Sequence, residues 1–441
     1  MFHTLFAAAL ASHATVDREG LDVLAEVSAS LADLDPERCE GTVHEAFRRL
    51  EATDTTAIDA AFVAAHPGAV DAVWVVQQQA WGALARLHRD GPVVEGCVDS
   101  FRRLDLALRG AQDLLLIHTP DATPWLVTEE LASFDDLRSG DVLVTRGGAL
   151  SSAGIAHIGA VDASFSHNAM VHIDARGRAW TVEAYLERGA LVQPLEDFLA
   201  HGLGRVTVVR YEDEALAARA AHLAYQRILH GPAIGYDEAF DSEAHEELFC
   251  SEIVPWAFSL AGHDEPVPMH RTRFDHEATP RLFAGMGVAA EDLAAPADLL
   301  FDPRFRVVGA WRALELLPEL HRQDAVVDGL FRHLEATGRA PVPTWTHRAT
   351  VDVGLALRRT PGLKALVKDK VHPDGDRAFL VTALALQDAG QRLYDAVWTE
   401  DLQGRVLTRE QLDRRIDGVL ADDAAARRGR GRRGGVSRVV R

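Results

Sequence analysis

Three residues with the side chains of a nucleophile, a base and an acid occur in this chain of 441 residues: Cys250, His167 and Glu183. We expect residues 251–254, directly after Cys250, to form the first turn of a helix. Unpaired N–H groups and the positive end of a helix dipole favour a thiolate at that position. The thiolate is the nucleophilic form of cysteine. A lone cysteine with apolar neighbours is, however, more often a small core residue.

His167 stands where a strand is expected to open, and a neutral imidazole is suited to accept a thiol proton near pH 7. In a chain with 20 histidines, a surface or capping role is the commoner one. Glu183 shares a strand face with Thr181 and Tyr185, where side chains usually pack. A buried carboxylate needs a hydrogen-bond partner, which an imidazole on the adjacent strand of a hairpin would supply. Such an acid would orient the base, as in a catalytic triad.

Short β-branched and aromatic runs, separated by Gly, Asp and Asn, surround these residues. They predict strands at residues 141–145, 169–173, 179–185, 190–193 and 205–211. A helix is expected from residue 212 to residue 229, and a turn at residues 174–177 joins two of the strands. Strands followed by helices predict an α+β fold, with an antiparallel sheet or small barrel and packed helices.

Helical patterns flank this strand-rich part on both sides. We predict a helical region over residues 1–125 and another over residues 311–426, with the α+β domain between them at residues 126–310. Residues 427–441 hold seven arginines and no acid. This low-complexity composition predicts a disordered tail.

The formal net charge is −20, which makes nucleic acid an unfavourable partner for the body of the protein. The arginine-rich tail could contact an anionic partner, although a solvated chain end is the simpler interpretation. No apolar run is long enough to span a bilayer. The three cysteines include no CxxC pair, so we expect no disulfide framework and favour the cytoplasm. Export is the alternative, because the N-terminus has a short apolar stretch, although this stretch lacks the basic residues of a signal peptide.

The order of motifs resembles that of the permuted papain-like cysteine amidases (YiiX/YebB-like), a circularly permuted branch of the NlpC-type hydrolases. The resemblance covers roughly residues 130–310. Its matching pieces are Gly140-Asp141, Ser166-His167 before a strand, Val182-Glu183-Ala184, Tyr236-Asp237 with Phe240, Cys250-Ser251-Glu252, and the closing segment 296–305. Each motif is weak alone, but together they occur in the family's order.

The resemblance implies that Cys250 is the nucleophile, His167 the base and Glu183 the orienting acid. It also implies that Ser166, Tyr236 and Asp237 contact the substrate, and that neither a metal nor a cofactor is needed. Two departures from the family pattern concern substrate handling. Phe249 replaces the tyrosine that often precedes the nucleophile, and Asn168 follows the histidine in place of a small apolar residue.

The function predicted from these residues is a cysteine hydrolase of the amidase or peptidase type, acting through an acyl-thioester intermediate. A small peptide, a cell-wall fragment and a lipid are all conceivable substrates. One alternative is a lipid acyltransferase or thiol esterase of the same fold class. A second alternative is a non-catalytic helical adaptor that carries an inactive hydrolase domain.

Overall fold

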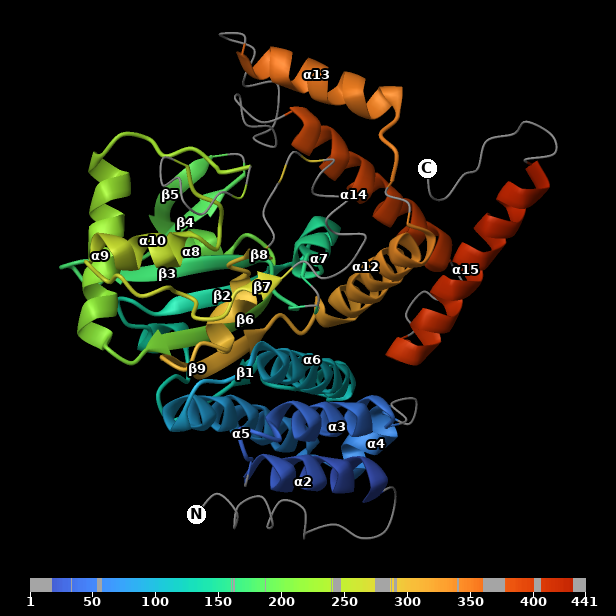
Figure 1. The fold of residues 1–441 in the computed structure, drawn as a ribbon, viewed down its shortest axis with the longest axis horizontal. Helices are drawn as coiled ribbons and strands as arrows, with labels where there is room; N and C mark the ends of the chain where they lie inside the picture. The colour runs from blue at the N-terminus through green and yellow to red at the C-terminus, as the bar shows by residue number, and fades with distance from the viewer. Residues whose placement is uncertain are drawn as a thin grey trace.

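The computed structural model describes most of the chain (Figure 1). The described residues are 18–32, 34–53, 58–159, 161, 163–186, 188–238, 240, 247–273, 286, 288, 292–338, 341–359, 377–399 and 406–430. The expected apolar start of the chain at residues 1–14 lies outside them. Figure 1 places the first helices on one side of a central sheet and the last helices at one end of it.

The central sheet has seven strands in the order β1-β9-β6-β2-β3-β4-β5, with every neighbouring pair antiparallel. The sheet ends at β1 on one side and at β5 on the other. This architecture confirms the predicted α+β fold with an antiparallel sheet. The strands are β1 (Trp125–Leu126), β2 (Val142–Gly147), β3 (His167–Ile173), β4 (Ala179–Tyr185), β5 (Gly189–Pro194), β6 (Leu203–Tyr211) and β9 (Phe305–Arg312). A separate pair joins β7 (Thr272–Arg273) to β8 (Asp292–Leu293).

Alternation along the strands explains why this sheet is buried on both faces. In β2, Val142 and Val144 belong to one apolar cluster, whereas Leu143 between them belongs to another. Side chains of successive strand residues point to opposite faces, so both faces of the sheet carry apolar side chains that must pack against other elements. Helix α9 (Glu214–His230) and helix α10 (Ile253–Leu260) contribute to the first cluster, and α8 (Leu195–Leu199) contributes to the second.

The turn between β3 and β4 forms as the sequence predicts. The N–H of Gly177 donates to the carbonyl of Asp174 at 2.9 Å. The Asp174 carboxylate also accepts from the N–H groups of Arg176 and Arg178. Gly177 has φ = 76°, a left-handed conformation that glycine adopts at little cost. The tight turn sets β3 and β4 side by side, which the site requires.

The flanking regions are helical, as predicted, but their limits differ from those expected. The remaining α-helices are α2 (Arg18–Ala32), α3 (Cys39–Glu51), α4 (Ala60–Ala65), α5 (Ala69–Asp90), α6 (Glu95–His118), α7 (Leu150–Ala156), α12 (Leu317–Thr337), α13 (Trp345–Arg359), α14 (Arg377–Val397) and α15 (Arg409–Arg430). Trp311, where the sequence pattern predicts helix, lies in β9 and faces Trp125 of β1. Helix α15 extends to Arg430, past the predicted start of a disordered tail at residue 427; residues 431–441 lie outside the described part.

Buried ion pairs join both helical flanks to the sheet. Asp113 of α6 accepts from the Nε atoms of Arg205 at 2.6 Å and of Arg312 at 3.3 Å. Asp324 of α12 pairs with Arg205 at 2.9 Å and with Arg146 at 3.0 Å. Charges this deeply buried are tolerated only when they are paired. The flanks therefore belong to the folded core around the sheet.

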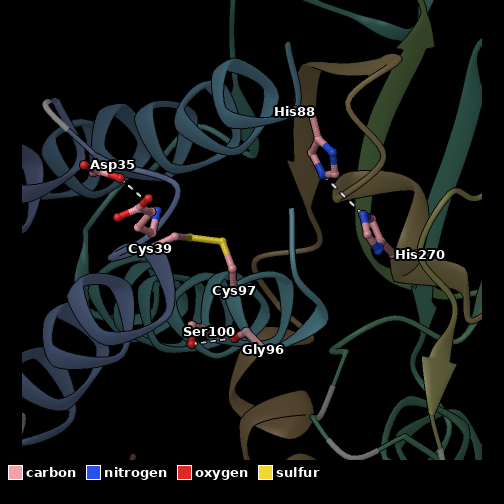
Figure 2. Close-up of a disulfide and its surroundings, with 8 residues drawn as sticks. Asp35, Cys39, His88, Gly96, Cys97, Ser100 and His270 are labelled. Atoms are coloured by element: carbon pink, nitrogen blue, oxygen red, sulfur yellow. Dashed lines mark hydrogen bonds between the residues drawn. A yellow bond between two sulfur atoms is a disulfide. The ribbon is translucent and has the colours of Figure 1, made fainter. Parts of the chain in front are cut away.

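A disulfide links Cys39 of α3 to Cys97 of α6, with 5.5 Å between their Cα atoms (Figure 2). The prediction of a chain without disulfides is therefore wrong. A count of cysteines cannot reveal a pair 58 residues apart in sequence, which only helix packing brings together. Both cysteines are fully buried, and Cys250 is the remaining free thiol.

Candidate active site

The three residues singled out in the sequence come from three elements that meet at one end of β3. His167 is the first residue of β3, Glu183 lies in the neighbouring strand β4, and Cys250 lies in the turn before α10. The Nε2 atom of His167 lies 2.8 Å from Oε2 of Glu183. The Cys250 thiol donates to the carbonyl of Ser166, the residue directly before His167, with the sulfur 3.7 Å from the oxygen.

Helix α10 begins at Ile253, later than the sequence predicts. A turn occupies residues 249–252 instead, because the Glu252 N–H donates to the Phe249 carbonyl and the Glu252 carboxylate accepts from the Phe249 N–H. Cys250 is therefore held by this turn and is not itself the first residue of the helix. Its exposed fraction is 8%, so Cys250 is buried but not completely shielded from solvent.

Glu183 is fully buried and uses both carboxylate oxygens. While Oε2 accepts from His167, Oε1 accepts from Thr181 Oγ1 at 2.9 Å and from Gln193 Nε2 at 2.6 Å. The two donors to Oε1 are neutral. They satisfy the buried carboxylate without cancelling its charge, which leaves that charge to act on the imidazole.

The environment of His167 favours its protonated form. Burial lowers the pKa of His167, but the side-chain hydrogen bonds with Cys250 and Glu183 outweigh it and raise the pKa from 6.5 to about 9. The ring of Tyr185 lies nearly parallel to the imidazole, with 4.7 Å between centroids and 13° between planes. Because Nε2 faces Glu183, Nδ1 is the ring nitrogen left for the thiol. An imidazolium beside a thiol stabilises the thiolate.

The other predicted site residues lie close to Cys250, but they differ in what they offer. Burial, together with the neighbouring Cys250, raises the pKa of Tyr236 well above its usual value. Asp237 is buried next to it. Ser166 supplies its carbonyl to the thiol, whereas its hydroxyl accepts from the N–H of Gly147 at 3.4 Å.

Residues 136–309 match the family described as permuted papain-like amidase enzymes, YaeF/YiiX, C92 family. This segment belongs to that family. It makes up about two fifths of the chain and contains all three residues of the candidate site. The description of the amidase family supports a cysteine hydrolase as the general class of the segment. Neither the search of curated proteins nor the search of solved structures found a match.

Several residues of the amidase domain that shape the site were missed in the sequence. Thr181 and Gln193 hold Glu183, and Tyr185 covers the imidazole. Gln193 lies opposite Thr181 in the register of β4 and β5, and this register is the signal that could have identified it. Asn168, a departure from the usual family pattern, is buried; its amide nitrogen can donate to the carbonyl of Pro296 at 3.2 Å, which ties β3 to the closing segment of the amidase domain.

Neither a metal-ligand cluster nor a membrane-spanning helix occurs among the described residues. No group of three or more His, Cys, Asp or Glu side chains there is arranged to hold a metal ion. No helix in the same residues has the length and apolar character needed to cross a membrane.

Proposed function

We propose that the amidase domain cleaves an amide or ester bond through an acyl-thioester intermediate, with Cys250 as nucleophile, His167 as base and Glu183 as the acid that orients the base. One observation carries the proposal: the His167 imidazole lies 2.8 Å from the Glu183 carboxylate, and the Cys250 thiol is hydrogen-bonded to the carbonyl of Ser166, the residue directly before His167. A nucleophile, a base and an orienting acid in this order form the general triad arrangement.

In the proposed reaction, His167 takes the thiol proton and the Cys250 thiolate attacks the substrate carbonyl carbon. The carbonyl π bond breaks, and its electron pair goes to oxygen. The backbone N–H of Cys250 and the hydroxyl of the neighbouring Tyr236 are suited to hold this oxyanion. His167 protonates the leaving amine or alcohol as the bond to it breaks. Water, deprotonated by His167, then hydrolyses the thioester and regenerates the thiol.

The structure also bears on the extent of this domain. We propose that it runs from β1 to β9, because a limit at residue 310 would divide β9, which ends at Arg312. The two helical flanks, which then lie before Trp125 and after Arg312, serve as supports that the buried ion pairs attach to the sheet.

We further propose that the protein matures in an oxidising compartment and not in the cytoplasm favoured by its cysteine count. The buried disulfide between α3 and α6 is the supporting observation, since such bonds persist mainly outside reducing compartments. Intact-mass measurement of protein from its native source, with and without reductant, tests this proposal. A fully reduced native protein would contradict it.

The proposed triad can be tested without the natural substrate. With p-nitrophenyl acetate as probe, we expect a burst of p-nitrophenol and an acetyl group on Cys250 by mass spectrometry. Cys250→Ala and His167→Ala should lose both signals while keeping the wild-type circular dichroism spectrum. His222→Ala, which removes an exposed histidine of α9, is the matched control and should keep them. A Cys250→Ala protein with the wild-type burst would overturn the proposal.

A further inference from the structure

We propose that Gln193, assisted by Thr181, is a positioning residue that maintains the charge and orientation of Glu183 and thereby the thiolate of Cys250. This inference rests on the proposed function. It concerns a side chain whose amide is hydrogen-bonded to Glu183 and not to the thiol.

The geometry shows what Gln193 does to Glu183. Its Nε2 atom lies 2.6 Å from Oε1 of Glu183, which is the shortest of the three hydrogen bonds to that carboxylate. Gln193 is 9% exposed and Glu183 is 0% exposed, so water cannot readily replace this donor. A buried carboxylate that loses a donor becomes easier to protonate, because its charged form is less well solvated.

Strand register explains why Gln193 can hold the carboxylate so firmly. Gln193 is the partner of Thr181 across β4 and β5, and Thr181 lies two residues before Glu183 on the same strand face. The Thr181 hydroxyl donates to Oε1 at 2.9 Å. Two donors from adjacent strands therefore fix Oε1, and this leaves Oε2 directed at Nε2 of His167.

The charge of Glu183 affects the Cys250 thiol through the imidazole of His167. No cation other than the imidazole of His167 is hydrogen-bonded to Glu183 among the described residues. A charged Glu183 stabilises imidazolium, and imidazolium stabilises the thiolate. Without a firmly held Glu183 carboxylate, the imidazolium loses part of its countercharge and stabilises the thiolate less. Loss of the Gln193 donor should therefore move the onset of thiolate formation to higher pH.

The test measures the rate constant of Cys250 alkylation by iodoacetamide as a function of pH. Cys39 and Cys97 are joined in the disulfide, so Cys250 is the free thiol that reacts in the folded, unreduced protein. In Gln193→Met, which keeps side-chain length and removes the donor, we expect the acid limb to move up by about one pH unit, with alkylation near pH 6 about tenfold slower. Thr181→Val should shift the limb in the same direction.

A matched control separates positioning from simple support of the fold. Gln323→Met also removes a buried glutamine amide, one that serves Arg146 and the Gly148 carbonyl. It should lower the melting temperature and leave the alkylation profile unchanged. A Gln193→Met profile identical to that of the wild type would overturn the inference. If the wild-type thiol itself reacted slowly, with the profile of an ordinary cysteine, the proposed function would fail instead.

Discussion

The ring of Tyr185 lies stacked on the imidazole of His167, with 4.7 Å between the centroids. Tyr185 belongs to the strand that also carries Glu183, so one strand holds the imidazole both by its edge and by its face. Stacking of this kind contributes about 0.5–1.5 kcal/mol beyond area burial. It restricts rotation of the imidazole away from Cys250.

We expect Tyr185→Leu to slow acetylation of Cys250 by about three- to tenfold, because the imidazole then loses its stacked ring. Tyr185→Phe keeps the aromatic face and should stay within about twofold of the wild-type rate, although it loses the contact of the hydroxyl with His201. Burst kinetics with p-nitrophenyl acetate measure both variants. Equal losses in the two variants would show that the hydroxyl matters more than stacking.

The raised pKa of His167 predicts how stability depends on pH. The folded state holds the His167 proton up to about pH 9, whereas the unfolded state releases it near about 6.5. The resulting stabilisation is complete below the unfolded pKa and is lost as the pH rises through the folded pKa. Urea unfolding from pH 6.5 to pH 9.5 should show this loss for the wild type. The loss of unfolding free energy over this pH range should be smaller in Glu183→Gln. An equal loss in both proteins would contradict His167 as its source.

His88 predicts a second dependence on pH, on the acid side. Burial, together with the neighbouring His270, lowers the pKa of His88 to about 4, and the two Nε2 atoms lie 3.3 Å apart (Figure 2). A histidine kept neutral in the folded state costs stability as the pH falls from its unfolded pKa through the folded one. We expect His88→Gln to flatten the decline in stability between pH 6.5 and pH 4. If urea unfolding shows the same fall in stability for His88→Gln as for the wild type, His88 is not its cause.

Removal of the disulfide should weaken the N-terminal helices. We expect the Cys39→Ser/Cys97→Ser double variant to lose about 2–4 kcal/mol of unfolding free energy, because the bond closes a long loop in the unfolded chain. Cys250→Ser is the matched control, since it alters the free thiol alone. A thiol titration should find one reactive cysteine in the unreduced, denatured wild type, and three would disprove the bond.

Asp113 offers a test of the attachment between the N-terminal helices and the sheet. Asp113→Asn keeps the shape of the side chain but leaves Arg205 and Arg312 without this buried countercharge. The expected loss of unfolding free energy is about 3–5 kcal/mol. Glu45→Gln removes an acid from an exposed pair with Arg49 and should change stability by less than about 1 kcal/mol. Similar small effects in both variants would argue against a supporting role for the buried pairs.

Local patterns in the sequence were enough to predict five of the seven strands of the central sheet, β2 to β6, because alternation and turn residues act over a few neighbours. The hairpin at residues 174–177 is one example, and from it the sequence also suggested that Glu183 could reach His167. The helix limits were less predictable. Trp311 fits a helical pattern, but its pairing with Trp125 of β1 makes it part of a strand.

The sequence by itself determined the α+β class, the order of the family motifs and the identity of the three candidate residues. Tertiary structure decided what holds them. Gln193 reaches Glu183 only through the register of two strands, and Cys39 meets Cys97 only through helix packing. Asp113 meets Arg312 although the two are 199 residues apart in sequence. Local preferences extend over one turn or one strand, whereas these contacts join residues whose distance in space is fixed only when the whole core has packed.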